Sequence, residues 1–141
     1  MYKALFMAAV LAIAGFPARA AADVLVARVN ISTQTMTVTI DGRVIHRWPV
    51  STARRGYVTP RGNWRPKRLH RMWYSSKYEN SPMPYSVFYN GGYAIHGTGA
   101  VRSLGRPASH GCVRLNVANA ARFYSLVREV GTQNTRIIVA N

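Results

Sequence analysis

Short strand-like segments separated by turn residues constrain this fold more than any other feature of the sequence. The stretch TMTVTI (35–40) alternates threonine with apolar residues, as a half-buried strand does. The Asp-Gly pair at 41–42 predicts a two-residue hairpin turn, and RVIHRWPVS (43–51) is the returning strand. Together with VLVARVNIS before them, residues 24–51 are expected to form a meander of three short strands.

The second half of the chain repeats this pattern. The segment 51–66 is rich in Gly and Pro and predicts a loop, which the basic group RPKRLHR (65–71) is expected to continue. Val87–Tyr89 and Tyr93–His96 flank Asn-Gly-Gly and predict a hairpin, with His96 at the end of its second strand. Side chains at strand ends are held by the sheet yet open to solvent, as active residues often are.

One substantial helix is expected late in the chain. Asn116 is a suitable N-cap and Gly131 a suitable stop, and TRIIVAN after it predicts a final strand. The fold class is therefore mainly β, with one helix packed on a sheet. An apolar stripe at near-helical spacing supports the helix, and comprises Val117, Ala120, Ala121, Tyr124, Val127 and Val130.

The first twenty residues have the pattern of an export signal. Lys3 precedes an apolar run (4–16), and ARA (18–20) offers small residues for cleavage. The run is shorter than the ~20 residues of a membrane span, although an uncleaved anchor is an alternative. We expect a signal peptide at 1–20, one domain at 21–141, and no stable membrane span after cleavage.

The chain is strongly basic, with 19 Lys and Arg against four Asp and Glu. Removing residues 1–20 would lower the formal charge from +15 to about +13. Such a charge favours anionic polymers or surfaces. Nothing resembles a nucleic-acid recognition helix, and export also argues against nucleic acid as a partner. A solvated basic surface with no partner is the alternative.

Cys112 is the only cysteine, so the chain cannot form an internal disulfide. In an oxidising compartment a lone thiol is expected to be buried or used. Two imidazoles are nearby in sequence: His110 is in the same loop, and His96 ends a predicted strand. Either could take the thiol proton and leave an imidazolium–thiolate pair. The amides of Gly111 and Cys112 are candidate donors to an oxyanion, which would suit acyl transfer.

Cys112 has two other interpretations, as a core residue and as a metal ligand. A free cysteine is often buried in a core, but its polar and flexible neighbours argue against this. His96, His110 and Cys112 have the right atoms for zinc, yet there is no CxxC, no HExxH and no fourth ligand at a familiar spacing. The sequence therefore predicts no metal and no cofactor. His46 and His70 are expected to be structural or surface residues.

The motif around Cys112 resembles the catalytic signature of the bacterial L,D-transpeptidases (YkuD/ErfK-type). It contains a His-Gly pair at 96–97, a spacer, and then Ser-His-Gly-Cys-Val-Arg at 109–114. PVST, TPRGNW and MPYSVFYNGGYAIHG also resemble family segments. The likeness covers roughly residues 24–140.

The resemblance implies a β-sandwich-like domain with the helix after the catalytic cysteine. Cys112 would attack a tetrapeptide stem of peptidoglycan at its third residue, release D-Ala and hold the stem as a thioester. An amine of a second stem would then give a 3→3 cross-link. Water would make the protein an L,D-carboxypeptidase, and a protein lysine would make it an enzyme that attaches envelope proteins to the wall.

The resemblance also assigns site residues and a location. His96 would be the general base, oriented by the Gly97 carbonyl, and His110 would shape the pocket. Ser109 would brace the loop, and Arg114 would steady it or meet a substrate carboxylate. Expected partners are stem peptides, anionic envelope polymers or envelope proteins, in a periplasm. A non-catalytic basic wall-binding domain is the alternative of another class. The residues expected to line the acyl-donor groove are Tyr85, Tyr93 and Met83.

Overall fold

The structure is a computed structural model that describes residues 12, 14–16 and 24–141. Most of the expected signal at 1–20 lies outside these residues, so the signal and the boundary at residue 20 stay predictions. No helix among the described residues has the length and apolar character to cross a membrane. The strands are β1 (Leu25–Asn30), β2 (Thr35–Ile40), β3 (Arg43–Pro49), β4 (Gly62–Trp64), β5 (Arg68–Ser75), β6 (Ser81–Asn90), β7 (Tyr93–Thr98), β8 (Val113–Asn116) and β9 (Thr135–Ala140).

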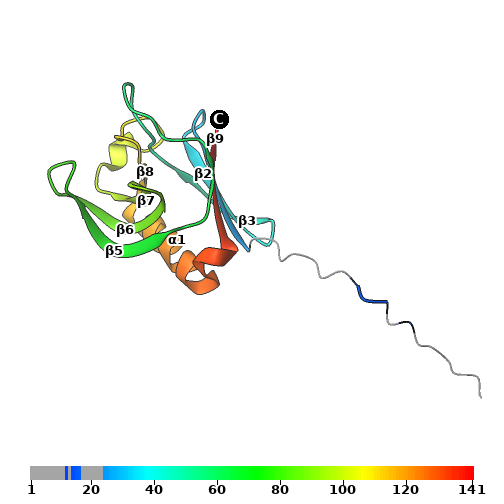
Figure 1. Ribbon diagram of the computed structural model, residues 1–141. Coiled ribbons are helices and arrows are strands. Elements are labelled where there is room, and N and C mark those ends of the chain that lie inside the picture. The colour runs from blue at the N-terminus through cyan, green and yellow to red at the C-terminus, as the bar shows by residue number, and fades with distance from the viewer. Residues whose placement is uncertain (1–11, 13, 17–23) are drawn as a thin grey trace, which may run out of the picture.

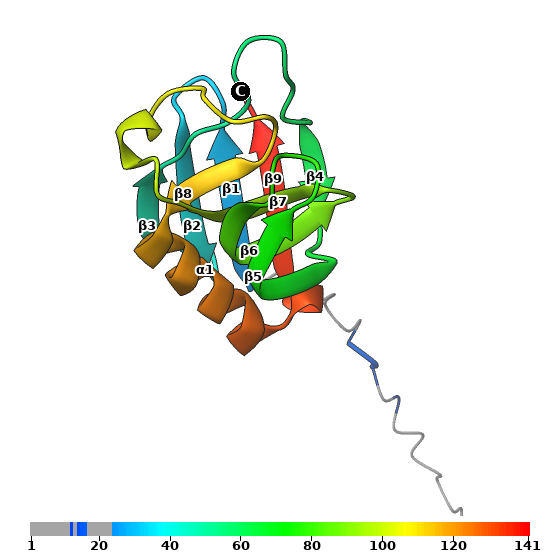
Figure 2. The same cartoon turned by 90° about the vertical axis from the view of Figure 1, so that its left-hand side faces the viewer.

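The strands form two sheets that face each other as a sandwich (Figures 1 and 2). One sheet has the order β3-β2-β1-β9-β4 and the other has the order β5-β6-β7-β8. Most neighbouring strands are antiparallel, whereas β1–β9 and β7–β8 are parallel. The expected fold class is confirmed: the protein is mostly β, with one long helix, α1 (Val117–Val130).

The meander expected over residues 24–51 is present as β1, β2 and β3. Asp41 and Gly42 have φ values of 49° and 78°, which is the left-handed backbone that a tight hairpin turn requires. The hairpin β6–β7 is also as expected, with Gly91 and Gly92 between the paired Asn90 and Tyr93. Local turn chemistry was sufficient to predict both hairpins.

Helix α1 begins and ends as expected. The Asn116 side chain accepts a hydrogen bond from the Ala118 amide at 2.9 Å, and Gly131 is the C-cap. The predicted apolar stripe was partly wrong, because Val117 is exposed while Phe123 and Leu126 are buried. The helix fills the space between the sheets, where it packs mainly on β6 and β7 and also touches β8 and β1 (Figures 1 and 2). Its largest apolar side chains therefore face the core.

The loop expected at 65–71 is a second correction, because residues 68–71 belong to strand β5. This is an edge strand of its sheet, and basic side chains on edge strands discourage pairing with other chains. The basic residues at 65–71 therefore obscured the alternation of side chains by which this strand could have been predicted. The short strand β4 was also missed, within the loop expected at 51–66.

The main core lies between the two sheets and α1. Alternate residues of the inner strands are fully buried, while their neighbours face outward. A second, smaller apolar cluster lies on sheet β5-β6-β7-β8 and includes Met83, Phe88 and Ala94, with Trp73 and Cys112 packed against it. This smaller cluster supports the site described below.

Candidate active site

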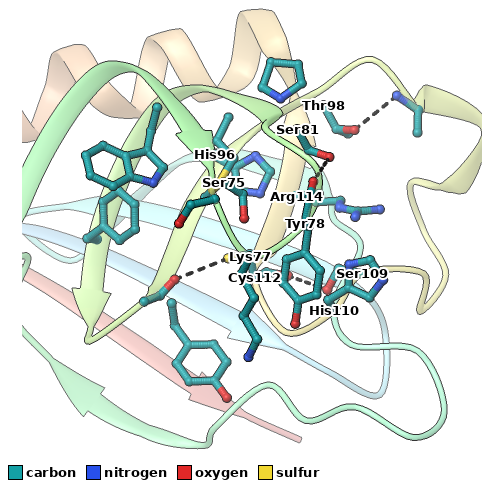
Figure 3. A pocket seen from close by; sticks show the side chains of 18 of the residues that line it. Ser75, Lys77, Tyr78, Ser81, His96, Thr98, Ser109, His110, Cys112 and Arg114 are labelled. Carbon is teal, nitrogen blue, oxygen red and sulfur yellow. Dashed lines mark hydrogen bonds between the residues drawn. The ribbon is translucent and has the colours of Figure 1, made fainter.

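The parallel pair β7–β8 brings the two ends of the sequence motif together. Ile95 pairs with Val113 and His96 with Arg114, so Cys112 lies directly before the paired segment of β8. The intervening loop is held to the chain near β3 by backbone hydrogen bonds, such as Ser109 N to Thr52 O at 2.9 Å. His96 and Cys112 therefore line the same cavity, into which both side chains point (Figure 3).

The His96 ring is buried and held in one orientation. Its Nδ1 lies 2.7 Å from the Gly97 carbonyl oxygen. A carbonyl only accepts hydrogen bonds, so Nδ1 carries the proton and Nε2 is left as an acceptor. Burial lowers the pKa of His96 to about 4; the Gly97 hydrogen bond opposes this shift and Arg114 adds to it. At neutral pH His96 is a neutral imidazole with a free basic nitrogen.

Cys112 is protonated in the same state. Burial raises the pKa of its thiol, against the opposing effects of the Ala94 backbone and Arg114. Its Sγ donates weakly to the Gly92 carbonyl oxygen at 3.8 Å. The expected imidazolium–thiolate pair is therefore not the resting state. The proton would move to Nε2 only as sulfur attacks.

The turn before Cys112 is braced by hydrogen bonds from Ser109, which is fully buried. Its hydroxyl donates to the Cys112 carbonyl at 2.7 Å and accepts from the Gly111 amide at 3.0 Å. Because this bond occupies the Gly111 N–H, the Cys112 amide is the remaining candidate for an oxyanion donor. The Gly111 carbonyl accepts from Thr59 Oγ1 at 2.8 Å.

Gly111 has a steric role instead. Its φ is +139°, and an added Cβ would lie 2.6 Å from Tyr93 Cε1 and 2.9 Å from the Val58 carbonyl oxygen. Only glycine fits between the Tyr93 ring and the loop that contains Val58.

His110 is part of the cavity wall. Its ring stacks on Tyr78 at 4.2 Å between centroids (Figure 3). Tyr57 meets the His110 ring edge-on at 4.8 Å between centroids. Desolvation lowers its pKa, and the nearby cations Arg54, Arg114 and Lys77 lower it further. This stack joins the loop that contains Cys112 to the turn between β5 and β6.

The cavity has a volume of about 680 Å³. Tyr93 and Met83 line it as expected, and so do Ser109 and Arg114. Tyr85 does not line it, since its ring packs edge-on against Tyr124 of α1 at 5.6 Å. Tyr85 has φ +54°, and this irregularity explains how Met83 and Phe88, five residues apart on β6, share one cluster.

The position of Arg114 is compatible with both expected functions, namely steadying the loop and binding a substrate carboxylate. Its guanidinium is about 3.4 Å from the Ala108 carbonyl oxygen, a long hydrogen bond that steadies the loop. Burial lowers the pKa of Arg114; Cys112 opposes this shift and Arg54 adds to it. The side chain also lines the cavity, where it is available to a carboxylate.

Sequence reasoning missed the part of the wall that β5, β6 and their connecting turn provide. The signal that could have found it is the aromatic-rich stretch MWYSSKY (72–78) near the basic group. Among the described residues, no three His, Cys, Asp or Glu side chains gather as metal ligands do. The missed lining residues are Arg68, Trp73, Ser75, Ser76, Lys77, Tyr78, Ser81, Pro82, Phe88, Gly92, Thr98, Gly99 and Ala100.

A β-sandwich that holds a cysteine, two histidines and a braced Ser-His-Gly-Cys turn in one cavity defines the class of protein. The chain belongs to the L,D-transpeptidase catalytic domain family (YkuD), which matches residues 25–139.

Relatives agree with this assignment. The Bacillus subtilis (strain 168) protein named "Putative L,D-transpeptidase YkuD" is 24% identical over 103 residues, which are 70% of this chain and 58% of that protein. An L,D-transpeptidase from Mycobacterium smegmatis is 25% identical, with a TM-score of 0.75 over 84% of this chain and 59% of that chain. L,D-transpeptidase 3 from Mycobacterium tuberculosis, in complex with a faropenem-derived adduct, is 25% identical, with a TM-score of 0.71 over 84% and 60%. The chain thus spans less than two thirds of each relative.

Proposed function

We propose that this protein is a peptidoglycan L,D-transpeptidase that acts through a thioester on Cys112. The observation that carries the proposal is the shared cavity of His96 and Cys112, in which Nδ1 is fixed by Gly97 and Nε2 is free. A base held in one tautomer beside a thiol is the arrangement that activates a cysteine nucleophile.

Acylation follows from these protonation states. As Cys112 Sγ attacks the carbonyl of the third stem residue, its proton passes to His96 Nε2. The cation at His96 exists only during the reaction, and its hydrogen bond to Gly97 then strengthens. The tetrahedral intermediate collapses, the bond from this carbonyl to the D-Ala nitrogen breaks, and the nitrogen takes the proton from His96. D-Ala leaves, and the stem stays on sulfur as a thioester.

Deacylation repeats these steps in reverse. An acceptor amine loses a proton to His96 Nε2 and attacks the thioester, the C–S bond breaks, and the thiol regains the proton. An amine of a second stem gives a 3→3 cross-link. Water would give an L,D-carboxypeptidase, and a lysine of an envelope protein would attach that protein to the wall.

Mass spectrometry of products from a disaccharide-tetrapeptide tests the proposal. A cross-linked dimer supports a transpeptidase, a tripeptide supports a carboxypeptidase, and no change with folded protein supports a non-catalytic wall-binding domain. Cys112→Ala should abolish turnover and leave the fold intact. His96→Ala should lower the rate by about 10²–10⁴-fold. If only His110→Ala lost acylation, the base assignment would be wrong.

A β-lactam of the penem or carbapenem class offers an independent probe, since a relative of this fold was solved with a faropenem-derived adduct. An increase in protein mass that disappears in Cys112→Ala would support a nucleophilic cysteine. Folded protein that never gains mass would favour the wall-binding alternative.

The basic surface supports a second part of the proposal, namely that the exported protein is held near anionic envelope polymers in the periplasm. Charge attraction of this kind weakens as salt screens it. Binding to isolated sacculi should therefore fall between about 0.05 and 0.5 M salt. Unchanged binding over that range would refute the attraction.

A further inference from the structure

A row of four residues crosses the sheet beneath the cavity and ends at the nucleophile. Arg68 on β5 pairs with Phe88 on β6, and Phe88 pairs with Ala94 on β7. Ile95 pairs with Val113 in parallel register, which places Cys112 beside Ala94. Arg68 and Cys112 are therefore at opposite edges of the same sheet, in the same row.

Two aromatic rings hold the Arg68 side chain over this row. Its guanidinium carbon lies 3.7 Å from the centroid of Phe88 and 4.8 Å from that of Trp73. Phe88 and Trp73 belong to the apolar cluster against which Cys112 packs. A guanidinium that stacks on a ring keeps its N–H groups at the edge, where they can form a fork for a carboxylate.

Only one weak polar contact occupies this fork. Arg68 Nη1 lies 3.3 Å from His70 Nε2. Within the part of the chain that the structure describes, Arg68 has no ion pair. The Arg68 side chain is exposed to solvent, and its stacking on two rings orients the charge without neutralising it.

The whole cavity has the same sign of charge. Arg68, Lys77 and Arg114 line it, and the described residues that line it include no Asp or Glu. Such a site attracts anionic ligands. Arg114 is two residues after Cys112, and one of its N–H groups is directed to the Ala108 carbonyl. Arg68 is on β5, at the opposite edge of the sheet from β8. The two arginines can therefore hold different parts of one ligand.

We propose that Arg68 determines specificity by binding a carboxylate of the acyl donor that is remote from the attacked carbonyl. The inference rests on the proposed function. The stacked guanidinium over β6 is two strand spacings, about 10 Å, from the row position of Cys112. That distance is the reach of about three extended residues or of one long side chain. In a stem peptide, the side-chain carboxylate of a diaminopimelate at position three or the α-carboxylate of the preceding glutamate satisfies it.

Three synthetic stem tetrapeptides distinguish these two sources. One has both carboxylates free, the second has the side-chain carboxylate of residue three as a carboxamide, and the third has the glutamate α-carboxylate as a carboxamide. With the free peptide, Arg68→Gln should lower kcat/KM about 10- to 100-fold, the value of a charge-assisted hydrogen bond. With the peptide amidated at the recognised position, wild type and Arg68→Gln should be equal.

Two further variants separate recognition from structure. Arg71→Gln removes a like charge from an exposed position of β5 that does not line the cavity, and should leave kcat/KM unchanged for all three peptides. Arg68→Lys keeps the charge but loses the forked pair of N–H donors, so its kcat/KM with the free peptide should lie between those of wild type and Arg68→Gln. Thermal melting of each variant verifies folding.

The outcomes are distinct. If amidation of one carboxylate, and not of the other, abolishes the effect of Arg68→Gln on kcat/KM, the inference is supported and that carboxylate is the one that Arg68 binds. Equal losses with all three peptides, or no loss with any, overturn it and leave the proposed function standing. A folded wild type that converts none of the peptides refutes the proposed function and this inference with it.

Discussion

The Nδ1–H of His96 donates to the carbonyl oxygen of Gly97, its own neighbour in β7, at 2.7 Å. The bond is local, yet it fixes which nitrogen of the buried ring is available to Cys112. Because the bond partner is a neutral carbonyl and not a carboxylate, it only partly offsets the cost of burying an imidazolium. The resting site is therefore uncharged at both Cys112 and His96.

This arrangement predicts an unusual dependence of activity on pH. His96 stays neutral down to a pKa of about 4, so kcat/KM should persist through pH 5–6, where an ordinary histidine of pKa about 6.5 is mostly protonated. A pH profile of acylation would therefore show kcat/KM falling on the acid side near pH 4; this fall is called the acid limb. His110→Asn should leave the limb in place. A fall in kcat/KM centred near pH 6.5 would mean that His96 titrates like an ordinary solvated histidine, and would contradict the burial described here.

The same burial predicts a loss of stability in acid. Between pH 6.5 and about 4 the unfolded chain protonates His96 and the folded chain does not, so the unfolded state gains protons as pH falls. This effect of His96 on the free energy of unfolding is absent above pH 6.5 and should reach about 3 kcal/mol of destabilisation near pH 4. Urea unfolding at several pH values measures it.

His96→Gln should remove most of this slope, because a glutamine does not titrate. His46→Gln is the comparison variant, since His46 stacks on Trp48 in the other sheet and does not line the cavity. Burial and Arg122 also lower the pKa of His46, so this variant shows how much of the slope comes from outside the cavity. If both variants kept the wild-type slope, the burial of His96 would not be its source.

Gly111→Ala should disrupt the turn before Cys112. The new Cβ would meet Tyr93 and the Val58 carbonyl, at a φ of +139° that side chains rarely adopt. We expect about 2 kcal/mol of lost stability together with a large loss of acylation. Gly99→Ala, at a position with open space, should unfold like wild type. A Gly111→Ala protein with normal stability would contradict the crowding described here.

Tyr89→Phe should stabilise the protein by about 1 kcal/mol, because a buried polar group without a partner costs free energy. Tyr89 is fully buried, its ring packs against Trp64 at 5.2 Å, and its hydroxyl has no hydrogen-bond partner among the described residues. Tyr89→Leu, which also removes the ring contact, should destabilise instead. A loss of stability in Tyr89→Phe, measured by urea unfolding, would show that the hydroxyl is paired.

The sequence by itself determined the elements that depend on near neighbours. The alternation of apolar and polar residues and the turn dipeptides specified the meander and the β6–β7 hairpin. Asp41 and Gly42, for example, adopt the backbone of their turn through their own conformational preferences, with no need of contacts to distant residues. Asn116 and Gly131 set the ends of α1 through their own capping geometry. The order and spacing of His96, Ser109, His110 and Cys112 were sufficient to indicate the family.

Only the tertiary structure decided what surrounds the cysteine. Arg68 and Tyr78 reach the cavity because β5 pairs with β6, and no local pattern encodes that pairing. Tyr85 packs against Tyr124 and does not line the predicted groove. The Gly111 amide donates to the Ser109 hydroxyl and is therefore not available to an oxyanion. The charge states of His96 and Cys112 follow from desolvation, which depends on atoms contributed by distant segments of the chain.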